Sequence, residues 1–239
     1  MVLNFAHRGS LTEAPENTLL AFEKALSHRP KGMELDVQLT KDDVLVVCHD
    51  AKLTRFNKKS TTLIKDLTWE EIQQIDVGSG FSEEYKGVHL TCLEDVLSIT
   101  PAEVLLNVEI KNIPVIYPGI EKKLLDCLET YNRLDNVIIS SFDHVALQNI
   151  FHLHPTLRLG MLFQYRLLDT WKYVKNSGLP IYSVHPNHVY VDQTFVQACK
   201  NAGYSVFPYT VNDWKCYEEL VSYGVDGVFS NRPEIFQTK

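Results

Sequence analysis

The sequence predicts an α/β fold, a (β/α)8 TIM barrel that carries a small insertion after its second strand. Eight short runs have the apolar character or the period-2 alternation of β-strands. Seven amphipathic segments separate these runs, and such strand–helix alternation implies parallel strands. The expected strands are 3–7, 33–39, 104–110, 137–140, 158–163, 181–184, 205–209 and 227–230.

A doubly wound open sheet is the alternative arrangement for the same alternation. No glycine-rich GxGxxG follows the first strand, which weakens a dinucleotide-binding version of that sheet. At 239 residues the chain is long enough for a sizeable core, as one large domain or two small ones. We expect a single domain over residues 1–239, with an inserted, lid-like subdomain at about 51–91.

The helices are expected to begin at residues that favour helix N-termini. Asn17 and Thr18 introduce a helix over 18–27. Inside the irregular, Lys- and Thr-rich insertion, Thr68 and Glu71 form a capping-box pattern that predicts a short helix over 68–75. The other helices are expected over 93–99, 119–131, 144–152, 168–175, 192–202 and 212–223.

The composition is ordinary for a soluble globular protein, with 45% hydrophobic and 22% charged residues. The net charge of −7 argues against nucleic acid as a partner, because phosphate-backbone binding favours a basic face. No apolar run approaches the roughly 20 residues of a membrane span, and no signal-peptide pattern is present. Five scattered cysteines without a CxxC pair indicate reduced thiols. We therefore expect a cytoplasmic protein without stable membrane insertion; its oligomeric state stays open.

The strand-like stretch 32–39 carries the first candidate site residues. Its apolar residues alternate with Glu34 and Asp36, and a later strand repeats the arrangement with Glu109 and Lys111. In a barrel these side chains would point inward, and the active site would lie at the C-terminal strand ends. The alternative for Glu34 and Asp36 is that both acids face water on a half-exposed strand. The alternative for Glu109 and Lys111 is a salt bridge. Three converging carboxylates would repel one another unless a cation neutralised them, and an all-oxygen site suits Mg²⁺ or Ca²⁺ better than zinc.

Two histidines occupy other strand ends. His7 and Arg8 follow the first strand, and His49 follows the strand-like run 44–48. Each histidine alone is more often structural, but the pair beside a candidate metal fits a general acid and a general base. Arg8 offers planar donors for two phosphate oxygens, and Lys111 adds a point charge. These residue types together indicate metal-assisted phosphate chemistry.

These residues belong to a series of motifs that closely resembles the glycerophosphodiester phosphodiesterases. The series follows the family's order along nearly the whole chain, so the resemblance is specific. The motifs are His7-Arg8-Gly9, Pro15-Glu16-Asn17-Thr18, Glu34-Leu35-Asp36-Val37-Gln38-Leu39-Thr40-Lys41-Asp42, His49-Asp50, Glu109-Ile110-Lys111, Ser140-Ser141-Phe142, Tyr209-Thr210-Val211-Asn212 and Gly224-Val225-Asp226-Gly227-Val228-Phe229-Ser230-Asn231-Arg232-Pro233.

The resemblance implies a fold, an activity and residue roles. It implies a TIM barrel with an insertion after the second strand, and a hydrolase that needs one divalent cation, Mg²⁺ or Ca²⁺. The implied substrates are small glycerophosphodiesters such as glycerophosphocholine and glycerophosphoethanolamine, which are split into sn-glycerol 3-phosphate and an alcohol. By motif, the implied roles are acid–base catalysis for His7 and His49, metal binding for Glu34, Asp36 and Glu109, and phosphate contact for Arg8 and Lys111. Which histidine is the base, and whether water attacks directly or through a cyclic phosphate, stay open.

Several positions depart from the family pattern without removing a catalytic group. Asp43 stands where Gly is usual, Asn231 where Asp is common, and Tyr209 where Trp is frequent. The segment 89–92, within the insertion, also differs, which concerns substrate preference. The aromatic residues Phe142, Tyr209 and Trp214, and with them Phe81 and Tyr85, are candidates for the pocket mouth, with core packing as the alternative role.

Two other functions compete with this reading. A related phosphodiesterase could act on intact lysophospholipid, which would require an apolar groove for the acyl chain. A non-catalytic barrel could only bind phosphodiesters, but such a protein is expected to lack at least one histidine or acid of the set, and all are present.

Overall fold

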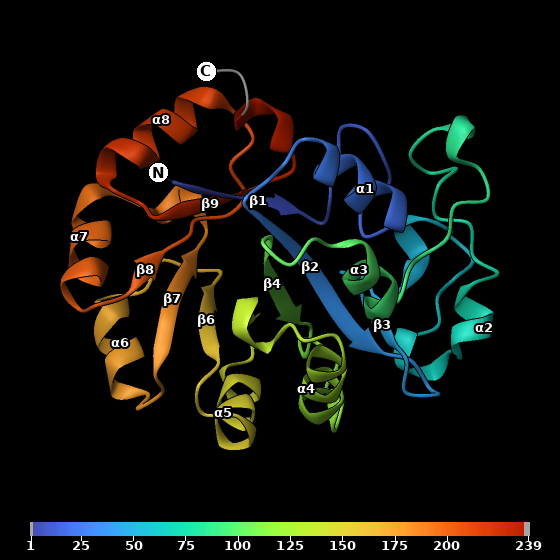
Figure 1. Ribbon diagram of the computed structural model, residues 1–239, viewed down its shortest axis with the longest axis horizontal. Coiled ribbons are helices and arrows are strands. Elements are labelled where there is room, and N and C mark those ends of the chain that lie inside the picture. The colour runs from blue at the N-terminus through green and yellow to red at the C-terminus, as the bar shows by residue number, and fades with distance from the viewer. Residues whose placement is uncertain (1, 237–239) are drawn as a thin grey trace.

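Eight parallel strands form the barrel of the computed structural model, which describes residues 2–236 (Figure 1). Their order around the barrel is β8-β7-β6-β5-β4-β2-β1-β9, and the short β3 pairs antiparallel with β2. The strands are β1 (Leu3–His7), β2 (Gly32–Leu39), β3 (Leu45–Val47), β4 (Leu105–Ile110), β5 (Val137–Ser141), β6 (Arg158–Phe163), β7 (Ile181–Pro186), β8 (Ser205–Val206) and β9 (Gly227–Ser230).

Backbone hydrogen bonds bridge the remaining gap between β8 and β9. Asp226 N donates to Val206 O at 3.0 Å, Phe229 N to Pro208 O at 3.0 Å, and Val211 N to Phe229 O at 2.8 Å. The expected strand 205–209 is regular only over its first two residues, and Pro208, which has no N–H to donate, interrupts it. The near-complete closure confirms the predicted TIM barrel and excludes the doubly wound open sheet.

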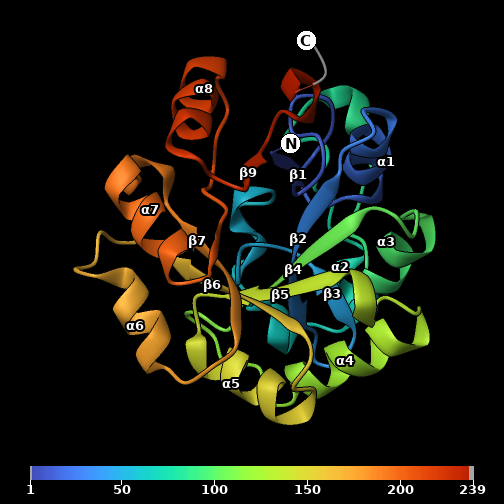
Figure 2. The same ribbon diagram turned by 60° about the vertical axis from the view of Figure 1, so that its left-hand side comes forward.

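The helices surround the barrel, as Figure 2 shows from the side of α7. Each of the seven expected between strands is present, within two residues at either end. They are α1 (Leu19–Ser27), α3 (Leu93–Ile99), α4 (Ile120–Thr130), α5 (His144–Leu153), α6 (Thr170–Asn176), α7 (Gln193–Asn201) and α8 (Trp214–Tyr223). Side-chain caps begin several of them as predicted; Thr18, for example, accepts from Ala21 N at 3.2 Å.

The segment between β3 and α3 has its own small apolar cluster on the outside of the barrel. It contains 3₁₀ turns and α2 (Trp69–Ile72), which starts with the predicted capping box of Thr68 and Glu71. The helix is shorter than expected because the backbone bonds then run three residues back, from Ile75 N to Ile72 O. The cluster consists of Val46, Cys48, Leu53, Ile64, Ile72, Val77 and Leu90.

Aromatic and aliphatic side chains fill one layer of the barrel interior. Phe5 lies 4.8 Å from Phe229 and 5.4 Å from Phe207, measured between ring centroids. Leu105 and Ile138 complete this cluster. Because side chains alternate along a strand, Phe5 and Leu105 are followed two residues later by His7 and Asn107 on the same inner face. The apolar layer therefore forms a floor beneath the polar residues at the C-terminal strand ends.

Candidate active site

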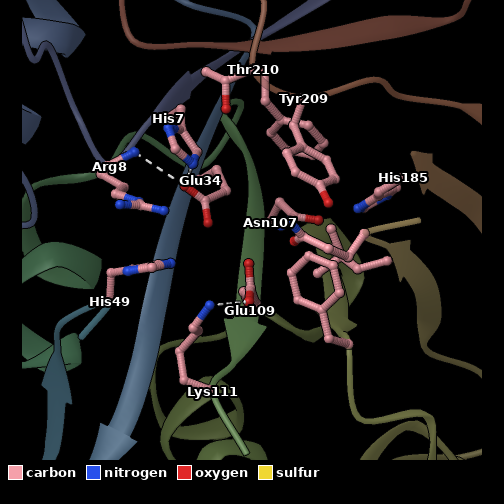
Figure 3. A pocket seen from close by; sticks show the side chains of 14 residues that line it. His7, Arg8, Glu34, His49, Asn107, Glu109, Lys111, His185, Tyr209 and Thr210 are labelled. Atoms are coloured by element: carbon pink, nitrogen blue, oxygen red, sulfur yellow. Dashed lines mark hydrogen bonds and ion pairs between the residues drawn. The ribbon is translucent and has the colours of Figure 1, made fainter. Parts of the chain in front are cut away.

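A pocket opens among the C-terminal strand ends, and most of the predicted site residues line it (Figure 3). They come from six different strands or the loops after them, so only the closed barrel brings them together. The lining residues are His7, Arg8, Glu34, His49, Asn107, Glu109, Lys111, Phe142, Leu162, Gln164, His185, Tyr209, Thr210 and Phe229.

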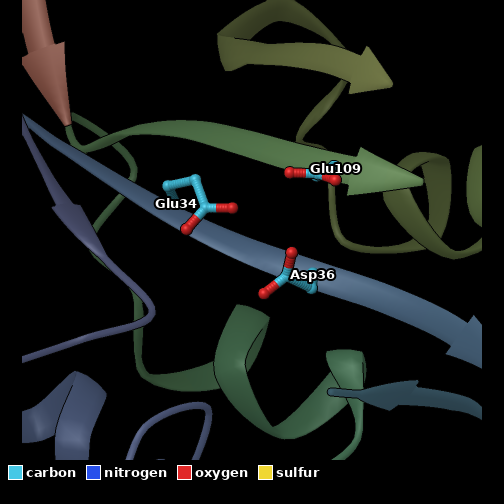
Figure 4. A group of neighbouring side chains, drawn as sticks. All are labelled: Glu34, Asp36 and Glu109. Atoms are coloured by element: carbon cyan, nitrogen blue, oxygen red, sulfur yellow. The ribbon is translucent and has the colours of Figure 1, made fainter. Parts of the chain in front are cut away.

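Three buried carboxylates converge beside this pocket (Figure 4). Glu34 and Asp36 come from β2, and Glu109 faces Asp36 as its register partner on β4. One oxygen from each lies within 4.8 Å of the others. The three side chains are nearly inaccessible, with 3%, 0% and 8% of their surface exposed. This geometry brings together the carboxylates that the sequence predicts as metal ligands.

The three carboxyl groups differ in their electrostatics because their neighbours differ. Burial, and then the charge of Asp36, raises the pKa of Glu34 well above its usual range. Burial would also raise the pKa of Asp36, but Arg8 and Lys111 outweigh it and hold that pKa well below its usual range. Burial raises the pKa of Glu109 despite the nearby Lys111. Ionising all three together therefore requires more positive charge than these side chains supply.

Arg8 and Lys111 bring positive charge to the carboxylates. Arg8 Nε lies 3.1 Å from Asp36 Oδ2, while Lys111 Nζ lies 2.6 Å from Glu109 Oε1 and 3.8 Å from Asp36 Oδ1. The Arg8 backbone N–H also donates to Glu34 Oε2 at 3.1 Å. The turn that places Arg8 requires Gly9, whose φ is +92° and whose added Cβ would lie 2.6 Å from the Ala21 carbonyl carbon.

The donor set fits a hard divalent cation. Asp36 Oδ1 is buried and has no hydrogen-bond partner, although buried carboxylate oxygens are normally satisfied. A cation between the three carboxylates would satisfy this oxygen and offset the repulsion that raises the pKa of Glu34. Only oxygen ligands contribute, which favours Mg²⁺ or Ca²⁺ over zinc.

His7 lies against the carboxylates on one side of the pocket. Its Nδ1 is 2.6 Å from Asn231 Oδ1, and its Nε2 is 3.9 Å from Glu34 Oε2. Because the Asn231 oxygen can only accept, Nδ1 carries the proton and Nε2 has a free lone pair. Burial, and then the charge of Arg8, lowers the pKa of His7 to about 4, so the ring is neutral near pH 7.

His49 lies across the pocket and has an acidic partner. Its Nδ1 is 2.7 Å from Asp50 Oδ1, and Asp50 Oδ2 accepts a 2.7 Å hydrogen bond from Arg55 Nε. Arg55 comes from the inserted segment and also binds Glu16, which accepts from Arg8 Nη1 at 3.1 Å. One network of hydrogen bonds thus connects His49 with Arg8.

The predicted pocket aromatics divide into two groups. Phe142 and Tyr209 line the pocket with ring centroids 5.9 Å apart, and Lys111 Nζ lies 5.6 Å from the Phe142 centroid. Trp214 is not among the described residues that line it; its ring is 5.1 Å from that of Tyr217 at the start of α8.

Phe81 and Tyr85 are also not among the residues of the described range 2–236 that line the pocket. Their rings meet edge to face within the inserted segment, with centroids 5.3 Å apart. The Tyr85 hydroxyl donates to Glu13 O at 2.6 Å, which ties the inserted segment to the loop after β1.

Sequence reasoning did not assign several residues that the fold places at the site. Asn107 and His185 line the pocket, and each has one buried polar atom, Oδ1 or Nδ1, without a hydrogen-bond partner. Alternation with Glu109 on the same strand could have revealed Asn107. Asn231 is noted in the sequence only as a departure from a motif, and its contact with His7 spans 224 positions.

The comparisons with known proteins agree with this geometry. The family model described as "Glycerophosphoryl diester phosphodiesterase family" matches residues 7–235. A glycerophosphodiester phosphodiesterase of Caldanaerobacter subterraneus subsp. tengcongensis is 39% identical, with 97% of this chain and 95% of that protein aligned. One of the same description from Bacillus altitudinis is 38% identical, covering 96% of this chain and 94% of that one.

Solved structures resemble the whole barrel. A phosphodiesterase of Oleispira antarctica, in complex with the product sn-glycerol-3-phosphate, has a TM-score of 0.88 at 28% identity, covering 99% of this chain and 95% of that chain. The glycerophosphodiester phosphodiesterase of Thermotoga maritima has a TM-score of 0.78 at 27% identity, covering 99% and 97%. Across residues 2–236, none of the helices has the length and apolar character that crossing a bilayer requires.

Proposed function

The chain belongs to the glycerophosphoryl diester phosphodiesterase family, and we propose that it hydrolyses glycerophosphodiesters such as glycerophosphocholine and glycerophosphoethanolamine. The products would be sn-glycerol 3-phosphate and the head-group alcohol. One observation carries this proposal: Glu34, Asp36 and Glu109 converge on a pocket that His7 and His49 also line. The pocket therefore combines the carboxylates, the acid–base groups and the cationic side chains that phosphodiester hydrolysis needs.

Glu34, Asp36 and Glu109 are the proposed ligands of one Mg²⁺ or Ca²⁺ ion. The unpartnered Asp36 Oδ1 and the raised pKa values of Glu34 and Glu109 support this assignment. When bound, the ion would polarise a phosphate oxygen and offset negative charge in the transition state. Arg8 and Lys111 are proposed to bind the other phosphate oxygens, because both line the pocket beside the carboxylates.

His7 and His49 are proposed as the general base and the general acid, respectively. The contact with Asn231 leaves His7 Nε2 unprotonated, so it can accept a proton from the attacking oxygen. The contact of His49 Nδ1 with Asp50 Oδ1 orients the ring, so that Nε2 can donate a proton to the leaving alcohol. The same residues would serve whether water attacks directly or a glycerol hydroxyl attacks first.

The segment at about 51–91 is proposed as a lid-like subdomain of the single barrel domain. Its own apolar cluster supports this division. Arg55 at its start contacts Glu16 and Asp50, so the segment is placed to brace one side of the pocket. We further propose that the enzyme acts in the cytoplasm on small molecules, for which the free cysteines and the net charge of −7 are the support.

Release of glycerol 3-phosphate tests the proposed function. The protein is incubated with glycerophosphocholine or glycerophosphoethanolamine, first with EDTA and then with Mg²⁺ or Ca²⁺ restored. We expect EDTA to stop product release and one of the two ions to restore it. Folded protein that releases no product with either ion would overturn the proposal, and undiminished release in EDTA would overturn its metal dependence.

A further inference from the structure

One buried glutamine binds the main chain on both sides of His49. Gln38 lies on the same face of β2 as Asp36, two residues later, and is 1% exposed. Its Nε2 donates to Cys48 O at 2.7 Å and to Asp50 O at 3.0 Å. These two carbonyl groups flank His49. Both hydrogens of one side-chain amide therefore fix the segment that carries this histidine.

The segment depends on such contacts because His49 does not lie on a barrel strand. It follows β3, which pairs antiparallel with β2, and its side chain is 34% exposed. Backbone hydrogen bonds hold the segment at its two ends, from Cys48 N to Asp36 O at 3.0 Å and from Ile64 N to Ala51 O at 2.9 Å. The bonds from the Gln38 amide lie between these ends, next to the histidine itself.

A tyrosine from the loop after β4 fixes the orientation of this amide. Tyr117 is 3% exposed, and its hydroxyl donates to Gln38 Oε1. Carbonyl oxygens only accept, so Nε2 has to face Cys48 and Asp50, which leaves Oε1 for the Tyr117 hydroxyl. Burial raises the pKa of Tyr117, so the hydroxyl keeps its proton. The backbone N–H of Tyr117 in turn donates to Asn112 Oδ1 at 3.1 Å.

We propose that Gln38 is a positioning residue for His49 and that Tyr117 maintains the orientation of its amide. The inference rests on the function proposed above, in which His49 is the general acid. Within the part of the chain that the structure describes, neither Gln38 nor Tyr117 lines the pocket. Gln38 therefore acts through the imidazole, for which a displacement of about 1 Å can cost about a hundredfold in rate.

Two substrates separate a positioning role from a purely structural one. The leaving alcohol of glycerophosphocholine needs a proton, whereas the p-nitrophenyl ester of glycerol phosphate releases a phenolate that needs none. Gln38→Met keeps the length of the side chain but removes both donors. We expect it to lower kcat for glycerophosphocholine about tenfold to a hundredfold, and kcat for the p-nitrophenyl ester less than about threefold. A structural role would lower both alike.

Tyr117→Phe is the milder variant, because it removes a single hydroxyl. It should show the same dependence on the leaving group with a smaller loss, about fivefold for glycerophosphocholine. It supplies the same test if Gln38→Met does not fold. Asn136→Leu is the control, since it removes an amide bond to Ala102 O, 2.8 Å long, before the start of β4 and β5. This end of the barrel is opposite the pocket, so kcat should stay unchanged with both substrates.

A double variant shows whether Gln38 acts through His49. In a His49→Ala background, Gln38→Met should cause no further loss of kcat for glycerophosphocholine, because the group that it positions is gone. Gln38 contacts none of the three carboxylates among its printed hydrogen bonds to Cys48, Asp50 and Tyr117. Added Mg²⁺ or Ca²⁺ should therefore raise the Tm of Gln38→Met as much as that of the parent protein.

Four outcomes would overturn the inference while leaving the proposed function intact. Folded Gln38→Met could retain parental kcat, or it could lose kcat equally with both substrates. The losses caused by Gln38→Met and His49→Ala could multiply in the double variant, which would show that Gln38 acts through another group. Loss of the metal-induced rise in Tm would assign Gln38 to the metal site instead. A folded parent protein that does not hydrolyse glycerophosphocholine would contradict the proposed function itself.

Discussion

The guanidinium of Arg55 donates a hydrogen bond to each carboxylate oxygen of Glu16, both at 2.7 Å. Its Nε simultaneously donates to Asp50, the partner of His49, at 2.7 Å. Arg55 belongs to the inserted segment, and Glu16 to the loop after β1. A single side chain therefore connects the insertion with both sides of the candidate active site, although nothing about an isolated arginine in the sequence indicates this role.

We predict that Arg55→Ala lowers kcat roughly tenfold to a hundredfold, because Asp50 and Glu16 lose the donor that orients them. Guanidinium chloride at non-denaturing concentrations should restore part of the lost kcat by occupying the space between the carboxylates. Lys65→Ala is the control, since Lys65 is exposed and, within residues 2–236, forms an ion pair only with its neighbour Asp66. A folded Arg55→Ala protein with parental kcat would contradict a positioning role.

The two histidines should differ in their dependence on the leaving group. His7→Ala and His49→Ala are each expected to lower turnover of glycerophosphocholine at least about a hundredfold with the fold intact. With a p-nitrophenyl ester, whose leaving group needs no proton, His49→Ala should recover most of its activity and His7→Ala should not. Recovery of His7→Ala but not of His49→Ala with this ester would exchange the roles of base and acid. Near-normal turnover of glycerophosphocholine by either variant would remove that residue from the mechanism.

Metal binding should be measurable without turnover. We expect saturating Mg²⁺ or Ca²⁺, at about 100 times Kd, to stabilise the protein by about 2.7 kcal/mol, raising Tm by roughly 5–10 °C. Glu34→Gln should abolish this rise because the amide removes one charged ligand. The metal-free Tm should change little, because burial, which raises the pKa of Glu34, already disfavours its charged form. Glu83→Gln, at an exposed site, is the control. An unchanged metal response in Glu34→Gln would exclude Glu34 as a ligand.

His185 should make the protein less stable in acid. Burial lowers its pKa from 6.5 to about 3 in the folded state, so its stabilising effect is complete above the unfolded pKa and is lost as the pH falls from 6.5 towards 3. Between about pH 7 and about pH 5 the loss is about 2 kcal/mol.

Denaturant titrations at these two pH values, on the parent protein and on His185→Gln, measure that contribution. We expect the variant to show a pH-dependent change in unfolding free energy that is smaller by about 2 kcal/mol. Equal changes in the two proteins would show that His185 does not titrate differently on folding.

Local sequence patterns predicted most of the barrel because strand and helix periodicities are properties of neighbouring residues. These patterns did not predict where an element ends when a proline or a change in backbone hydrogen bonding sets its boundary. The regular part of β8 ends before Pro208, and α2 stops at Ile72 where the hydrogen bonding tightens. Trp214 was a candidate for the pocket mouth as a loop aromatic, with packing as the alternative role, and its ring lies 5.1 Å from that of Tyr217.

By itself, the sequence determined the fold class and the chemical types that the site contains. Alternating strands impose an inner and an outer face, so Glu34 and Asp36 had to share a side, as did Glu109 and Lys111. Their order along the chain also carries the resemblance to the family, which the comparisons confirm.

Only the tertiary structure decided which groups face one another. The contact of His7 with Asn231 joins the two ends of the chain and sets the protonated ring nitrogen, while Arg55 reaches Glu16 from the insertion. The pocket likewise takes its lining from segments far apart in the sequence, from His7 to Phe229. Such contacts depend on strand order, register and closure, which are set by packing over the whole barrel, so no local pattern can encode them.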